Sequence, residues 1–329
     1  MKKLLYIFLG LSLMFGCSDD SSDDNTNPLD DTNPVYLDDN GVTIKAKDWS
    51  VVGDQGVING VTYTVVDETM LREMVANEED LTALATTKVT DMGDLRDYEL
   101  NYNVTTDFNQ PIGNWDTSNV TNMLRLFMNY TSFNQDISFW DVSNVTNMGN
   151  LFTYCAEFNQ PIGNWDTSNV TNMAATFAET SFNQDISNWD VSSVNRMDSM
   201  FEGAVSFNQP IGNWNVENVL RITSMFNGAV SFNQPLNDWD VSGLIHNSDM
   251  WAVFKNASSF NQDISSWDVS NIQNMQEMFK NASSFNQNLS SWSVDNVTMC
   301  YDFSVDSLTD SAMTSWTLPQ PNFTNCNPN

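Results

Sequence analysis

The chain has 329 residues, with 12 Lys or Arg against 42 Asp or Glu, so its formal net charge is −30 at pH 7. A charge of this size and sign repels phosphate backbones and anionic lipid headgroups, which argues against a nucleic-acid partner. It favours solubility, or a cationic or calcium-bridged partner, and the charge alone does not choose among them.

The first residues predict export from the cytoplasm. Lys2 and Lys3 precede an apolar run that ends at Phe15, and the small residue Gly16 follows it. These are the features of a secretory signal peptide, which we assign to residues 1–16. The run is shorter than the roughly 20 apolar residues that a membrane-spanning helix needs.

Cys17 lies directly after Gly16 and four residues after Leu13, an arrangement that resembles the lipobox of bacterial lipoproteins. The resemblance implies that the Cys17 thiol is diacylated and becomes the mature N-terminus, so we expect a membrane contact through a lipid anchor. Acyl chains contribute roughly 0.8 kcal/mol per buried methylene. The Met14-Phe15 pair departs from the usual small residue at the second position before the cysteine, and an ordinary signal peptide is the alternative.

Residues 17–40 are rich in Asp, Asn and Ser. Low hydrophobicity and uniform negative charge predict a disordered, solvated tether. An acidic run after an acylated cysteine also resembles the surface-export signal of Bacteroidetes lipoproteins. This implies a lipid-anchored position on the outer face of the outer membrane, with a periplasmic spacer as the alternative.

Residues 41–86 predict an N-terminal cap for the repeats that follow. Strand-like stretches cover 42–44 and 61–65, and a helix is expected around 68–76. The exposed end of a repeat array needs such a cap. Residues 89–92 are the start of a degenerate first unit.

A repeat of about 25 residues dominates the chain. The triplet Phe-Asn-Gln recurs at intervals of 25, 25, 24, 25, 25, 28 and 25 residues, and a tryptophan follows each Phe by seven. The tryptophans are Trp115, Trp140, Trp165, Trp189, Trp214, Trp239, Trp267 and Trp292. We therefore expect residues 87–303 to form eight to nine stacked units, because one unit cannot bury its apolar face alone.

The second unit illustrates the expected fold. Residues 133–142 are extended-looking and rich in β-formers, whereas Met148, Leu151 and Phe152 follow the i, i+3, i+4 pattern of a helical stripe. Thr146 is suited to cap a short helix. The pattern predicts an α/β repeat, a leucine-rich-repeat-like solenoid with short parallel strands on one face and short helices on the other.

The asparagine of each triplet is interpreted as a structural ladder, because a stacked amide can bond the turn backbone and its own copies. An exposed amide ladder that reads a ligand is the alternative. The column comprises Asn109, Asn134, Asn159, Asn183, Asn208, Asn233, Asn261 and Asn286.

The run Val-Thr-Asn-Met and the longer run Phe-Asn-Gln-Asp-Ile-Ser-Xaa-Trp-Asp-Val-Ser resemble the BspA-like leucine-rich-repeat surface proteins, also known as the DUF285 or mycoplasma-lipoprotein-type repeat family. The resemblance covers about residues 87–303, and residues 62–92 resemble the lead-in module of that family. It implies a bacterial surface protein, of a kind that in some members is linked to adhesion to host proteins or other cells.

No residue set predicts catalysis, so we expect no enzyme activity and no cofactor. The single histidine, His246, has no partner for a zinc or catalytic site. An aspartate follows most of the tryptophans, and this column is interpreted as turn residues that bond local amides. Calcium relieving the repulsion along that column is the alternative, although no calcium-loop spacing supports it. The tryptophans are interpreted as core, with a sugar-stacking platform as the alternative.

A binding surface is expected where the units differ. Small polar side chains after the triplet and before the tryptophan form this candidate face, for which we single out Asp136, Ser138, Asp185, Ser187, Asp263 and Ser265. The tail, residues 304–329, is a cap or a loose end, and Cys300 and Cys326 are a possible disulfide there, with Cys155 as a buried filler.

These features predict a non-catalytic surface lipoprotein that mediates protein or cell adhesion. The alternatives are a glycan-binding lipoprotein for nutrient capture, which requires exposed aromatic side chains, and a passive structural spacer. The ligand, protein or glycan, is not specified by the sequence.

Overall fold

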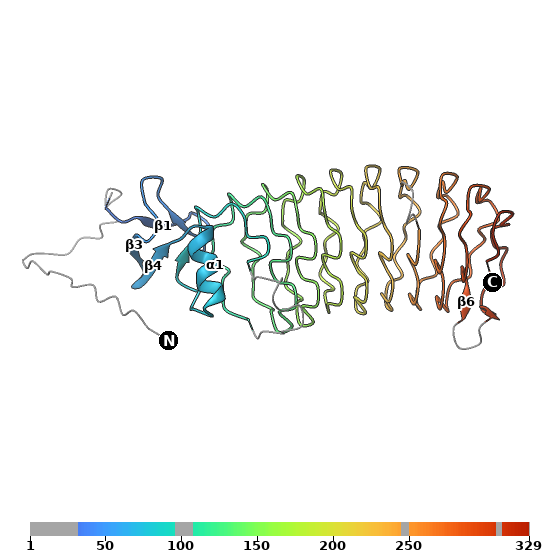
Figure 1. Cartoon of the computed structure of the whole chain (residues 1–329), viewed down its shortest axis with the longest axis horizontal. Coiled ribbons are helices and arrows are strands. Elements are labelled where there is room, and N and C mark those ends of the chain that lie inside the picture. Colours follow the sequence, from blue (N-terminus) through green and yellow to red (C-terminus); the bar gives the residue numbers. More distant parts are fainter. Residues whose placement is uncertain (1–31, 96–107, 245–249, 307–310, 329) are drawn as a thin grey trace, which may run out of the picture. The chain divides into compact units, whose positions relative to one another are not determined.

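A computed structural model describes residues 32–95, 108–244, 250–306 and 311–328. The described residues from 33 onward belong to one unit. Its named elements are listed in chain order as β1 (Val35–Leu37), β2 (Ile44–Ala46), β3 (Gln55–Ile58), β4 (Val61–Val65), α1 (Glu68–Ala76), β5 (Leu84–Ala85), β6 (Val305–Asp306) and β7 (Ser311–Ala312). Most of them belong to the N-terminal cap (Figure 1).

The cap contains two small sheets and one helix. β1 and β2 are antiparallel, and β3, β4 and β5 form a second sheet in which β3–β4 is antiparallel and β4–β5 is parallel. Asn59 and Gly60 join β3 to β4 with φ values of 51° and 81°, the left-handed conformations that a two-residue hairpin turn requires. β1 lies inside the 17–40 range that the sequence predicted as tether, so the folded cap begins earlier than expected.

Helix α1 begins where Asp67 caps it. The Asp67 carboxylate accepts a hydrogen bond from the Met70 backbone N–H at 2.9 Å, and Leu71 is the fully buried residue of the helix. This is the standard solution to the free N–H groups of a helix start. Within the described ranges, no helix has the length and hydropathy that a membrane span requires.

The repeat units stack through single-residue parallel bridges. The bridges join Asp91 to Asn122, Asn122 to Asn147, Asn147 to Asn172, Asn172 to Arg196, and Arg196 to Arg221. Successive coils therefore lie side by side, as Figure 1 shows for the green to red part of the chain. The expected parallel strands are reduced to one bridge residue in each of these units.

The expected helices are absent from the described repeats. In the second unit, the backbone N–H groups of Met148, Asn150, Phe152 and Tyr154 donate to carbonyls of the next unit at 2.7–3.0 Å. The alternate N–H groups bond back three residues, as from Leu151 to Met148 at 3.1 Å. Every such segment is thus a run of turns, and α1 is the one helix in the described part of the chain. The prediction of an α/β leucine-rich-repeat-like solenoid with helices on one face is wrong.

Competition between two sets of carbonyls explains this outcome. A helix of one or two turns is marginal by itself, because it gains few bonds for the dihedrals that it fixes. Here Asn150 and Tyr154 take positive φ values of 54° and 62°, which a continuous right-handed helix does not contain, and their N–H groups donate to the next unit. A left-handed residue costs roughly 1–2 kcal/mol, and the bond between units offsets that cost. Turns also repeat every three to four residues, so the apolar spacing did not distinguish them from a helix.

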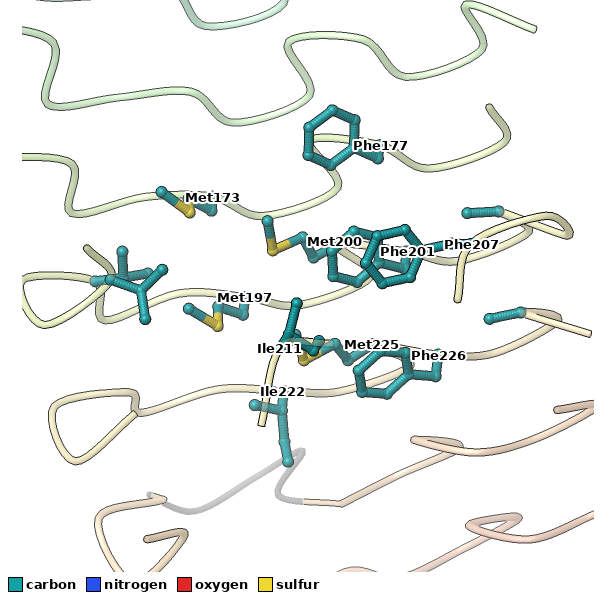
Figure 2. Packing of buried hydrophobic residues seen from close by; sticks show 14 of the residues in the cluster. Met173, Phe177, Met197, Met200, Phe201, Phe207, Ile211, Ile222, Met225 and Phe226 are labelled. Atoms are coloured by element: carbon teal, nitrogen blue, oxygen red, sulfur yellow. The ribbon is translucent and has the colours of Figure 1, made fainter. Parts of the chain in front are cut away.

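The core is a set of aromatic and aliphatic columns that run through the stack. The Phe152 ring lies 5.6 Å from Phe127 and 5.7 Å from Phe177, its equivalents in the neighbouring units, and 3.8 Å from Phe158. Figure 2 shows the same arrangement further along, with Phe201 beside Phe207 and the Met173 and Met197 side chains on successive coils. Each unit therefore completes the core of its neighbours.

The C-terminal residues close the last unit. β6 and β7 pair antiparallel, and the Trp316 ring packs edge-on against Phe285 with centroids 4.8 Å apart. A disulfide joins Cys300 to Cys326. The tail is thus packed as a cap over residues 311–328, which leaves the polar columns of the stack as the features to consider for function.

Candidate functional site

The asparagines of the Phe-Asn-Gln triplets bond neighbouring units together. The Asn134 side-chain oxygen accepts from the Asn159 backbone N–H at 3.0 Å and from the Gln160 side chain at 2.9 Å. The same backbone bond links every pair of column neighbours from Asn109 to Asn286, at 2.9–3.0 Å. The amide oxygens are therefore engaged inside the scaffold rather than offered to a ligand.

A second set of asparagines also bonds neighbouring units together, in five places along the stack. The Asn144 side-chain amide donates to the Ser118 carbonyl at 2.7 Å, and Asn169 donates to Ser143 in the same way. Asn119, Asn218 and Asn296 make the equivalent bond. The recurrence of Asn-Val-Thr at the repeat spacing was the available signal, and it marks these positions as structural.

The tryptophan column is buried and hydrogen-bonded. Its indoles are 1–5% exposed, and each indole N–H donates to a backbone carbonyl of the preceding unit or, for Trp115, of the cap, as from Trp140 to Ile112 at 3.1 Å. A sugar-stacking platform needs open ring faces. The platform that the sequence left open for these residues is therefore not supported, and they are core residues.

The aspartates that follow the tryptophans bond their own turns. The Asp166 carboxylate accepts from the Ser168 N–H at 3.1 Å and from its hydroxyl at 2.6 Å, and these two bonds hold the pKa of Asp166 below its usual range. Asp141, Asp190, Asp240 and Asp268 make the same backbone bond. No group of three or more His, Cys, Asp or Glu side chains is arranged to hold a metal ion in the described part of the chain.

The candidate binding face has the same local chemistry. The exposed Asp136 accepts from the Ser138 N–H at 3.0 Å, and Asp185 and Asp263 bond Ser187 and Ser265 at 2.9 Å. The structure thus brings each Asp and Ser together as a pair. The three pairs lie in units that are not direct neighbours, so they do not form one continuous patch.

Two polar features near the ends of the stack were not anticipated. At the C-terminal end, the Lys280 ammonium contacts both Glu277, at 2.9 Å, and Asp302, and these hydrogen bonds raise the pKa of Lys280. At the other end, the β1–β2 hairpin covers Asp116. Two residues singled out from the sequence, Cys17 and His246, lie outside the described residues.

The fold and its polar columns define a class of protein. It is a repeat protein in which stacked units of about 25 residues share aromatic columns and are joined by ladders of asparagine side chains. The chain belongs to the family described as "Mycoplasma protein of unknown function, DUF285", which matches residues 67–181, 156–252 and 245–316.

The family match confirms the repeat family that the motifs resembled, and its description assigns no activity. Comparison with curated proteins gave no match, and comparison with solved structures gave none. The bacterial group and the lipid anchor stay predictions.

Proposed function

We propose that the protein is a non-catalytic, lipid-anchored cell-surface protein that mediates adhesion to proteins or other cells through the exposed side chains of its repeat units. One observation carries this proposal. The repeated polar side chains bond within or between units, as Asn134 and Asp166 do, whereas the exposed positions between them vary from unit to unit. A regular scaffold that displays varied side chains suits multivalent binding, in which many weak contacts give a combined affinity higher than that of each contact.

The anchor is tested by labelling. Cells that produce the full chain are fed labelled palmitate, and the Cys17→Ala variant is compared with Cys155→Ala as a matched control. Cys155 is buried and its thiol pKa is raised by burial, so it is not an acylation site. We expect label on the parent chain and on Cys155→Ala only. Label on Cys17→Ala would contradict the anchor.

Adhesion is tested on intact cells that carry the full chain. We expect external protease to remove the protein, and we expect protein-coated surfaces to retain these cells more than cells producing Cys17→Ala. Protection from external protease would place the protein on the inner side of the membrane and would remove adhesion. Accessible protein without any gain in attachment would favour a passive spacer.

A second candidate, glycan binding for nutrient capture, is favoured by two exposed aromatic side chains. Trp251 and Tyr301 occupy equivalent positions in their units, because the backbone carbonyl of each accepts a hydrogen bond from a backbone N–H of the preceding unit. Their side chains are 41% and 59% exposed. One unit separates them, so their spacing of about two inter-strand distances is roughly 10 Å. Stacking of sugar rings on such side chains is tested on a glycan array with Trp251→Ala and Tyr301→Ala.

The exposed Trp49 of the cap provides the control, because Trp49→Ala removes an open indole without touching the repeats. We expect a bound glycan to be lost with either repeat variant and to be kept with the control. Equal binding by all variants would refute stacking at this column.

A further inference from the structure

A cavity of about 190 Å³ lies between the β1–β2 hairpin and the first two repeat units. The hairpin contributes Asp38 and Lys45 to its lining, and the repeats contribute Asp116, Asp141 and the ring of Phe139. The hairpin is held in place by its backbone, because the Ile44 N–H donates to the Asn114 carbonyl at 2.9 Å. The lining is therefore a built feature of the folded chain.

Asp116 differs from all other aspartates of its column. The hairpin leaves it 1% exposed, whereas Asp141, Asp166 and the later members are exposed to solvent. One carboxylate oxygen of Asp116 accepts from Ser118, as in the other units, at 3.1 Å from the N–H and 2.7 Å from the hydroxyl. Its second oxygen has no hydrogen-bond partner among the described residues. A buried carboxylate oxygen without a partner is costly, so a donor is needed at this place.

The charges that line the cavity do not balance. Three carboxylates face it, and Lys45 is the one cationic residue among the described residues that line it. The Lys45 ammonium lies 3.5 Å from Asp38. Burial opposes its charge, but the carboxylates of Asp116 and Asp38 outweigh burial and raise the pKa of Lys45. The lining still has an excess of negative charge, which favours a second cation.

Phe139 supplies an apolar wall where other units are polar. Its side chain is 48% exposed and stands directly before the tryptophan, a position that is Asn, Asp or Ser in every other unit. An aromatic face near carboxylates attracts an organic cation through both its charge and its carbon atoms. The same face offers nothing to a metal ion, for which the described carboxylates are not arranged.

We propose that this cavity binds a small organic cation, a primary alkylammonium, through Asp38, Asp116 and Asp141, with its carbon chain against Phe139. The volume of about 190 Å³ has room for a short free amine or for the end of a lysine side chain. This inference is independent of adhesion, because the cavity lies where the β1–β2 hairpin meets the first two units and the later units take no part in it.

The test is a calorimetric titration of the full-length protein with 1,4-diaminobutane. The neutral 1,4-butanediol and calcium chloride are titrated as controls, and Nα-acetyl-lysine N-methylamide distinguishes a lysine side chain from a free amine. We expect saturable binding of the diamine and no binding of the diol. Binding of the lysine derivative as well would extend the site to a protein partner.

Asp116→Asn is compared with Asp166→Asn, its exposed column equivalent outside the cavity. Both variants keep the turn, because the amide oxygens of Asn215 and Asn288 already accept the same backbone bond in this chain. We expect diamine affinity to fall about tenfold or more for Asp116→Asn, as for a lost charge-assisted hydrogen bond, and to be unchanged for Asp166→Asn.

Three results would overturn the proposal: no saturable binding of the diamine at millimolar concentration, equal affinities for Asp116→Asn and the parent chain, or binding of calcium in place of the diamine. If Asp116→Asn does not fold, Asp141→Asn is measured against the exposed Asp190→Asn, with the same expectations.

Discussion

Substitution of Phe201 by alanine probes the aromatic columns that hold the units together. The Phe201 ring is fully buried and lies 3.8 Å from Phe207, 5.8 Å from Phe177 and 5.7 Å from Phe226. A buried Phe→Ala change costs about 3–5 kcal/mol. Because units in a stack contact only their neighbours, the missing ring weakens the interfaces on both sides. We expect a loss of about 4 kcal/mol in the free energy of unfolding.

The assay is urea unfolding followed by tryptophan fluorescence, with Phe139→Ala as the control. Phe139 is 48% exposed and packs on no column, so its loss is expected to change the free energy of unfolding by about 0.5 kcal/mol or less. A loss below about 1 kcal/mol for Phe201→Ala would show that the aromatic columns contribute little to holding the units together. Equal losses for the two variants would show the same.

Three further predictions concern the polar ladder, the disulfide and the turn aspartates. Asn159→Ala removes the acceptor for Asn183 and Gln184 and should lower the free energy of unfolding, measured by chemical denaturation, by about 1 kcal/mol. Asn164→Ala changes an exposed residue of the same unit and should leave that free energy unchanged. The Cys300–Cys326 disulfide joins residues 26 positions apart in the sequence. Its reduction should lower the free energy of unfolding by roughly 3 kcal/mol, which a thermal scan with reductant would show as a lower midpoint. Hydrogen bonds from Ser270 lower the pKa of Asp268. The stabilising contribution of Asp268 is therefore present above the unfolded pKa of about 3.9 and is lost as the pH falls through the lowered folded value. Asp268→Asn should reduce this acid-induced loss of stability, measured in thermal melts between neutral pH and pH about 3.

The sequence predicted the stacked units well because its strongest signal was periodic. A tryptophan seven residues after each Phe-Asn-Gln triplet requires every unit to place equal residues in equal environments. The burial of Trp140 and Trp165 and the cross-unit bonds of Asn134 follow from that requirement. In the same way, the resemblance of the motifs led to the family.

The local conformation of the turn segment was not predictable from the same pattern. Met148, Leu151 and Phe152 have the spacing of a helix, and only the next unit decides that the N–H of Asn150 bonds outward rather than back along the chain. The residues that adopt the left-handed backbone, Asn150 and Tyr154, are not glycines, so the sequence did not indicate this conformation. The helix prediction failed because the competing acceptors come from another unit.

The cap shows the same limit. Asp116 looks like every other aspartate of its column, and only the packing of the β1–β2 hairpin over it removes its access to water. The hairpin itself begins in a segment whose composition predicted a tether, because three residues of β1 are too few to change an average over that range. Phe139 departs from the Asn, Asp or Ser that precedes the other tryptophans, but this departure alone did not point to a cavity.

The repeated aromatic side chains face one another inside the stack. Acrylamide quenching of tryptophan fluorescence measures this burial in a variant with Trp49→Phe and Trp251→Phe, which removes the two strongly exposed indoles. We expect a blue-shifted emission with little quenching until the protein is unfolded. A red-shifted emission that is readily quenched in the native protein would contradict it, because the indole columns would then be open to solvent.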